Sequence, residues 1–338
     1  MTGVRKGGGR EVDQLSFQAR KAQIDIAAIR LISIAAVIVS LLAVVVVRNR
    51  HFLDANNLRD VFMDTAILGI AAIAQLLVML TANIDVSSSS IMAVSGFAAA
   101  LLMKTAHGLN PVVSLALGVV LGIAMGALNG LVVSYGQVPS IIVTLGTLSI
   151  FRGFNFIISG GGWVVSRDLP DSFRTLANGG FRYTPNLVVI FLCIAVLFYG
   201  VLNFLRAGRN LYAIGSHLEN ARILGINSKL STFSVFSVAG LLFGLCGVLW
   251  VSRFNFAQSN TASGYELTVI AAAVIGGTGV NGGRGTVEGV ALGAFLLSFL
   301  INAMNAVKIS PFWKMAVQGI VILAAVIFDA YLVNRRRQ

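Results

Sequence analysis

Charged side chains that interrupt apolar sequence are the residues of this chain best suited to chemistry. Asp85 lies in NIDVSSSSIMAVSG, Arg152 in LSIFRGFNF, and Glu266 opens the stretch ELTVIAAAVIGG. A charge among apolar residues is costly unless it is paired or functional. We therefore treat these three as candidates to contact a polar solute. Three polar residues beside Asp85 join them as candidates: Asn83, Ser87 and Ser90.

The four serines at 87–90 follow Asp85 directly. Serine hydroxyls can bond backbone groups that are left free where a helix breaks. The pattern therefore predicts a discontinuous helix that borders a polar cavity. Two interpretations of Asp85 stay open: its carboxylate caps the helix that follows, or it contacts a passing solute.

Catalytic and metal-binding patterns are absent from the sequence. There is no Gly-x-Ser-x-Gly or His-Glu-x-x-His motif, and the two cysteines, Cys193 and Cys246, lie far apart in apolar runs. The glycine-rich stretch 276–285 has Gly283-Arg284 where a phosphate loop needs Lys-Ser/Thr, so it predicts a tight turn. We expect a chain that is not an enzyme and holds no metal or cofactor.

Composition places the chain in a membrane. Hydrophobic residues make up 57% and charged residues 11% of 338 residues, against about 25% charged in soluble domains. The predicted fold is all-α and polytopic, with about ten transmembrane helices. The apolar segments lie near 29–47, 62–81, 86–103, 111–134, 139–158, 186–205, 231–252, 265–279, 286–307 and 312–333.

An even number of spans places both termini on one side, and their basic residues favour the cytoplasm. We expect a cytoplasmic tail at 1–28, one transmembrane domain at 29–334 and a basic tail at 335–338. The longest outer loop is then 159–185, and the polar loop 206–230 is cytoplasmic. The net charge of +12 fits contact with anionic lipid, and no nucleic-acid-binding motif is present.

Glycines recur at every fourth position of the segment 111–134. Such spacing predicts a groove along one helix face, where another backbone approaches closely. The four helix-packing residues are Gly118, Gly122, Gly126 and Gly130. The segments 62–158 and 231–333 could form an inverted repeat, although they show no sequence similarity to each other.

The polar loop predicts a short helix. Ser216 and Glu219 have the spacing of a capping box, and Gly225 is a natural helix stop. We expect an amphipathic helix near 217–224 that stands apart from the spans. Its position fits either a helix on the lipid surface or a contact for a partner protein.

At this loop the sequence resembles a known family. GRNLYAIGSHLENARILGI is similar to the cytoplasmic coupling segment of ribose-type sugar ABC transporter permeases. His217 and Asn220 depart from the usual Asn and Ala. The positions that the resemblance assigns to coupling are Gly208, Arg209, Tyr212, Gly215, Glu219, Arg222 and Gly225.

Three further stretches resemble the same family in the same order: NIDVSSSSIMAVSG, VPSIIVTLGTLSIFRG and SGYELTVIAAAVIGGTGVNGGRGTVEG. Asn83 and Ser89 stand where the family has glycine. The run TLGTLSIFRG, followed by SGGGWV and DLP, resembles the branch that includes permeases for rhamnose and autoinducer-2.

The resemblance implies a pore subunit in the bacterial inner membrane that moves a sugar or sugar-like solute. Its implied partners are a second permease chain, ABC ATPase subunits that use ATP and magnesium, and an extracytoplasmic sugar-binding protein. The alternative is an ion-coupled secondary transporter of a small polar solute. That alternative needs an intramembrane carboxylate relay, for which Asp85 and Glu266 are the candidates.

Overall fold

The computed structural model describes residues 36, 38–40, 42–43, 45–106, 108–181, 184–310, 313, 316, 319–320, 323 and 327. The predicted spans 29–47 and 312–333 lie mostly outside the described residues, and the tails 1–28 and 335–338 lie wholly outside them. Within the described part the fold is helical, apart from a short antiparallel hairpin of β1 (Gly180–Phe181) and β2 (Thr184–Pro185).

The helices follow the predicted apolar segments closely. They are η1 (Arg50–Leu53), α2 (Ala55–Leu80), α3 (Ser88–Thr105), α4 (Pro111–Ser134), α5 (Ser140–Ser159), η2 (Ser166–Asp168), α6 (Asp171–Asn178), α7 (Asn186–Phe204), α8 (Arg206–Ser216), α9 (Leu218–Ile223), α10 (Ser228–Phe254), α11 (Tyr265–Ile275) and α12 (Val287–Ala306). Seven are long and apolar enough to cross a membrane: α2, α3, α4, α5, α7, α10 and α12. α11 has only 11 residues.

Local signals explain where several helices begin and end. Pro111 occupies the first turn of α4, and the side chain of Asn110 accepts the Val112 N–H. The hydroxyl of Thr286 accepts the Gly289 N–H at the start of α12. Gly160 ends α5 in the left-handed conformation, which glycine adopts without strain.

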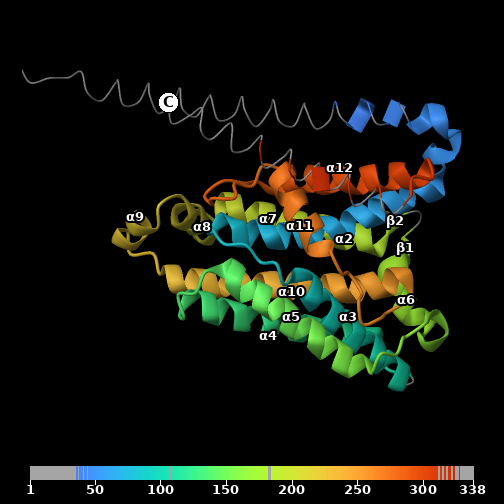
Figure 1. Ribbon diagram of the computed structural model, residues 1–338, viewed down its shortest axis with the longest axis horizontal. Coiled ribbons are helices and arrows are strands. Elements are labelled where there is room, and N and C mark those ends of the chain that lie inside the picture. Colours follow the sequence, from blue (N-terminus) through green and yellow to red (C-terminus); the bar gives the residue numbers. More distant parts are fainter. Residues whose placement is uncertain are drawn as a thin grey trace, which may run out of the picture.

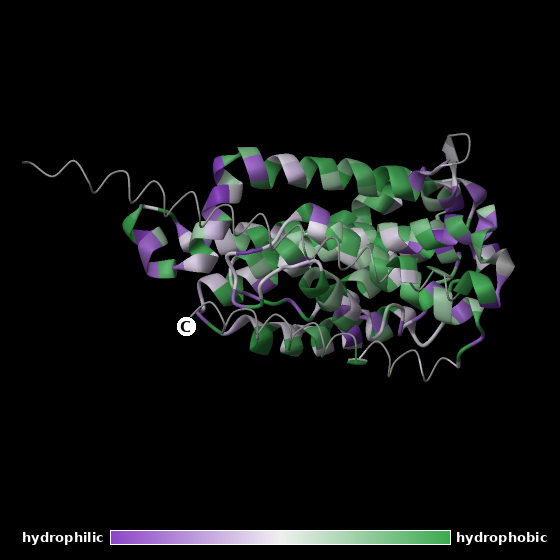
Figure 2. Ribbon diagram, turned by 90° about the horizontal axis from the view of Figure 1, so that it is seen from above, coloured by the Kyte–Doolittle hydropathy of each residue, from purple (hydrophilic) through white to green (hydrophobic). Residues whose placement is uncertain are grey.

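The long helices lie side by side, and polar elements close both ends (Figure 1). α8 and α9 form one end, called here the α8–α9 end. α6 and the hairpin lie at the opposite end, the α6 end. Hydrophilic residues gather near these two ends and hydrophobic residues dominate the middle (Figure 2), as expected for a bundle that crosses a hydrocarbon layer.

α4 and α10 pack backbone against backbone. A methyl group at Gly122 would collide with the carbonyl oxygen of Gly240, and one at Gly126 with that of Phe236. Gly118 and Gly130 likewise face α10, where an added Cβ would meet Val248 and Phe233. The glycine face of α4 therefore lies against α10, and Gly240 and Gly244 supply the matching surface.

The second half of the bundle repeats the packing of the first half, with its helices running in the opposite direction. α2 runs from the α6 end to the α8–α9 end, and α10 runs back. α4 packs on α3 and α10, while α12 packs on α11 and α2. Because these pairings correspond, the packing supports the inverted repeat that the sequence left open.

Candidate functional site

The chain re-enters the bundle after α2. Leu80 ends that helix at the α8–α9 end, and Ala82 takes a left-handed conformation with φ of 59°. The next residues, called here the 81–87 coil, run back between the helices. Hydroxyls of α5 satisfy two of their backbone groups: Ser140 accepts the Ile84 N–H at 3.1 Å, and Thr144 accepts the Val86 N–H at 3.1 Å. The predicted helix break is therefore present, and side chains of α5 support it.

Asp85 is fully buried in this coil. Its Oδ1 accepts the Ser87 backbone N–H at 2.8 Å and the Ser87 hydroxyl at 2.7 Å. Ser87 also accepts a hydrogen bond from Asn129 of α4 at 2.8 Å, and the Ser90 hydroxyl donates to the Ser87 carbonyl at 2.7 Å. Ser87 immediately precedes α3, so Asp85 stabilises the turn that leads into this helix, but no side-chain hydrogen bond caps α3 itself. In this conformation Asp85, Ser87 and Ser90 bond to one another.

Arg152 of α5 joins the first turn of α3 to a coil. Its Nη2 donates to the Ser89 hydroxyl at 3.2 Å, and its Nη1 donates to the Thr261 carbonyl at 2.7 Å. Thr261 belongs to residues 255–264, called here the 255–264 coil, between α10 and α11. One turn along α5, Asn155 donates to the carbonyl of Ser259 at 2.8 Å. α5 therefore holds the coils that precede α3 and α11.

Glu266 lies in the first turn of α11. Its Oε2 is buried and has no hydrogen-bond partner among the described residues. Its charge acts on Arg152. Arg152 also holds Ser89, which adjoins Ser90 in the chain, so it lies beside the bonded group around Asp85.

The polar loop consists of two helices, α8 and α9, rather than the one helix predicted. Ser216 ends α8, and no side-chain hydrogen bond caps α9 at His217. The capping-box prediction is therefore wrong. Glu219 instead pairs with Arg222 across one turn at 3.0 Å, and Gly225 closes the turn after α9 with φ of 77°.

α8, the first of the two helices, packs closely on the spans. Added side-chain atoms at Gly208 would meet the backbone of α7, and at Gly215 they would meet the Leu80 carbonyl and the Gly283 N–H. Tyr212 donates to the Gly285 carbonyl at 2.8 Å. Burial raises the pKa of Tyr212, and the nearby charge of Glu288 adds to the shift.

α8 therefore packs on the glycine-rich turn before α12. Gly283 also donates its N–H to the Leu80 carbonyl at 3.1 Å. This contact joins α8, the end of α2 and the turn, and only the tight-turn character of the glycines was visible in the sequence. Arg209 is exposed and donates to the Phe204 carbonyl at 3.2 Å.

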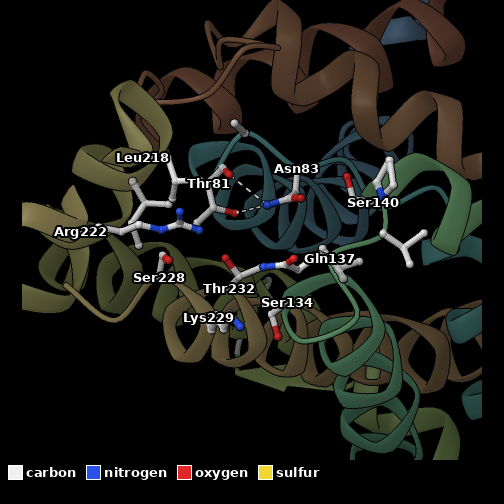
Figure 3. A pocket seen from close by; sticks show the side chains of 15 residues that line it. Thr81, Asn83, Ser134, Gln137, Ser140, Leu218, Arg222, Ser228, Lys229 and Thr232 are labelled. Atoms are coloured by element: carbon white, nitrogen blue, oxygen red, sulfur yellow. Dashed lines mark hydrogen bonds between the residues drawn. The ribbon is translucent and has the colours of Figure 1, made fainter. Parts of the chain in front are cut away.

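A cavity of about 450 Å³ opens at the α8–α9 end (Figure 3). Asn83 is the solute-path candidate that lines it, and Arg222 is the coupling candidate. The remaining lining residues were not predicted: Thr81, Ala82, Val133, Ser134, Gln137, Val138, Pro139, Ser140, Ile214, Leu218, Ser228, Lys229 and Thr232. They come from separate helices and turns, so no local sequence signal unites them.

Comparison with known proteins identifies the family. The family model described as branched-chain amino acid transport system / permease component matches residues 57–326. The ribose import permease protein RbsC of Escherichia coli (strain K12) is 34% identical over 291 residues, which cover 86% of this chain and 90% of RbsC. The autoinducer 2 import system permease protein LsrC of Photorhabdus luminescens is 34% identical over 296 residues, covering 87% of this chain and 88% of LsrC.

No solved structure matches the chain. The family match covers most of the sequence, and the described part of the chain holds seven helices that could span a membrane. Its polar groups hold broken helices in place instead of forming a catalytic set. The chain therefore belongs to the family of branched-chain amino acid transport system permease components, as its resemblance to ABC permeases predicts.

Proposed function

We propose that this protein is the inner-membrane permease subunit of an ATP-driven ABC importer for a sugar or sugar-like solute. The observation that carries the proposal is the identity shared with two import permeases over nearly the whole chain. One relative imports ribose and the other autoinducer-2, which is why we favour a polar, sugar-like solute. The same relatives favour this function over an ion-coupled transporter.

The α8–α9 end would face the cytoplasm and receive the ATPase. Ile223 and Leu224 of this end are 83% and 76% exposed, and apolar side chains at such positions are suited to burial in a partner. Arg209 of α8 and Glu219 and Arg222 of α9 add charge to this end. α8 rests on the glycine-rich turn and on the end of α2, so a movement of the docked ATPase would reach the 81–87 coil through rigid contacts.

The remaining features of the complex follow from the same family. Two permease chains would enclose the solute path, each with ten spans and both termini in the cytoplasm. Asn83, Arg152 and Glu266 would line that path, whereas the buried group of Asp85, Ser87 and Ser90 would hold α3 in position. ATP and magnesium would bind to the partner ATPase.

The outer loops would receive a sugar-binding protein. The loops 159–185 and 253–264 are joined by a β-bridge in which the Val164 N–H donates to the Ala257 carbonyl at 3.0 Å. The bridge makes one surface of the two loops. Binding of the solute-binding protein at the α6 end would open the path from that side.

The test is uptake of radiolabelled ribose by vesicles that contain this chain, its ATPase and the binding protein. The double variant Glu219→Arg/Gly225→Pro should abolish uptake and transport-coupled ATP hydrolysis, because it reverses a charge on α9 and places proline at a positive φ. Membrane insertion should remain. Gly200→Ala is the control, since an added Cβ at Gly200 meets nothing within 4 Å. Normal uptake by the double variant would contradict the coupling role.

A further inference from the structure

The cavity at the α8–α9 end has an unusual charge. Arg222 of α9 and Lys229 of α10 both line it, and the described lining contains no carboxylate. Figure 3 shows the two cationic side chains with hydroxyl groups of Ser228 and Thr232 close by. Lys229 makes no hydrogen bond or ion pair to any described residue. The positive charge of Lys229 is therefore not balanced by a contact with any described residue.

The partner of Arg222 does not neutralise the site. Glu219 is 79% exposed and contacts the guanidinium at 3.0 Å through one nitrogen, Nη1. A guanidinium carries five N–H donors, so Arg222 can hold Glu219 and a second anion together. An exposed ion pair of this kind is weak, so it leaves Arg222 able to bind an anion in the cavity.

Uncharged donors complete the site. The Ser134 side chain is 7% exposed, lines the cavity, and its Oγ has no hydrogen-bond partner among the described residues. A buried hydroxyl without a partner is unfavourable, so a ligand that accepts its proton would be favoured. The cavity also lies at the start of α10, a 27-residue helix whose amino end attracts anions.

The volume points to more than a simple anion. About 450 Å³ lies within the usual range for small-molecule sites, roughly 300–1,000 Å³. The amides of Asn83 and Gln137 and the hydroxyl of Ser140 also line it. Such groups bond to the hydroxyls of a polyol, while Arg222 and Lys229 suit a phosphate group.

We propose that this cavity binds a phosphorylated sugar from the cytoplasmic side. The proposal rests on the proposed function, because that function places the cavity in the cytoplasm and makes its solute a sugar. A separate kinase that transfers the γ-phosphoryl group of ATP to a hydroxyl of the imported sugar, with release of ADP and a proton, would supply the ligand. A ligand held by both Arg222 and Lys229 would tie α9 to α10 and slow transport as the product accumulates.

Titration calorimetry on the full chain in detergent micelles tests the site, with ribose 5-phosphate as the probe. Lys229→Gln should weaken binding at least about tenfold, because it removes a charge-assisted hydrogen bond. Thr232→Val is a milder second variant, and it should weaken binding to a smaller extent. Arg206→Gln removes the same charge from the same end of the molecule outside the cavity lining, so it should bind like the parent. Unphosphorylated ribose should not displace the probe.

Equal affinity in the parent and Lys229→Gln, or no saturable binding by the parent, would overturn the proposal. Lipid headgroups also carry phosphate, so the chain is compared in nanodiscs of phosphatidylglycerol and of phosphatidylcholine. If phosphatidylglycerol blocks the binding of ribose 5-phosphate, and this block depends on Lys229, the site binds a lipid headgroup instead. ATP-dependent uptake is measured separately. Normal uptake by a chain that does not bind ribose 5-phosphate would contradict only the proposed phosphate site. Uptake that needs no ATPase would contradict the proposed transport function.

Discussion

Buried polar side chains fix the irregular segments of this bundle. Asp85 accepts the Ser87 N–H in the break between α2 and α3, and Arg152 ties Ser89 to the 255–264 coil. In a membrane interior each unsatisfied backbone group costs several kcal/mol. The role of these residues is therefore decided by which atoms they bond, more than by their charge.

Substitutions at Asp85 separate support of the turn at Ser87 from contact with the solute. Asp85→Asn keeps an oxygen that can accept from Ser87, so we expect near-parental thermal stability and uptake. Asp85→Ala leaves the Ser87 N–H and hydroxyl without their acceptor and should cost about 1–3 kcal/mol. The measurement is the thermal midpoint in detergent, with uptake in parallel. Loss of uptake by a stable Asp85→Asn protein would instead indicate that the carboxylate contacts the solute.

The ion pair between Lys104 and Asp168 gives a pH-dependent prediction. The hydrogen bond from Lys104 at 3.0 Å, with one from the Val165 N–H, holds the pKa of Asp168 below its ordinary value of 3.8. A carboxyl group whose pKa is lower in the folded than in the unfolded state stabilises the protein at pH values above its unfolded-state pKa. This stabilisation is lost as the pH falls through the folded-state pKa. We expect Lys104→Gln to lower the thermal midpoint at pH 7, and the difference from the parent to shrink below about pH 4. A difference that stays constant across this range would exclude the pair as its cause.

Close packing of α4 on α10 is the main contact between the two halves at the level of elements. The glycines of α4 let the backbones touch, and Gly240 and Gly244 do the same from α10. Helix association in lipid depends on such contacts, because lipid tails are as apolar as the helices. α5, by contrast, exposes Gly146 and Gly153 to open space.

Gly122→Ala and Gly146→Ala test this difference with the same chemical change. At Gly122 the new methyl group meets the Gly240 carbonyl, and overpacking of this kind costs about 1–3 kcal/mol. At Gly146 nothing lies within 4 Å, so we expect parental stability. Thermal midpoints of the purified variants provide the comparison. Equal thermal midpoints would show that the close contact between α4 and α10 does not contribute to stability.

At the scale of the whole molecule, the bundle has two polar ends of different character. The α6 end carries a loop, a short helix and a hairpin, whereas the α8–α9 end carries two helices seated on a glycine turn. The apolar middle in Figure 2 separates them. If the bundle spans the membrane as proposed, these ends lie on opposite sides.

Cysteine labelling tests the orientation. In a background without Cys193 and Cys246, we expect Ser172→Cys at the α6 end to react with a membrane-impermeant maleimide in intact spheroplasts. Asn220→Cys on α9 should react only after permeabilisation. Both positions are exposed in the structure, so accessibility does not limit the reaction. The reverse pattern would place the α8–α9 end outside.

The sequence alone determined the helical spans and the permease family. A span is set by a local run of apolar residues, which is why the predicted segment 111–134 and α4 have the same bounds. The motifs that indicate the family are also local strings. The single predicted helix at 217–224 was close to α9, although its cap was wrong because Ser216 belongs to α8.

Only the tertiary structure decided which residues meet. Three contacts join segments that are distant in the sequence. α4 packs on α10, α8 packs on the glycine-rich turn, and Arg152 bonds to Thr261. The cavity with Arg222 and Lys229 arises from several such segments at once. Hydropathy fixes how far a helix runs but not its rotation or its neighbour, so these contacts depend on how the whole bundle packs.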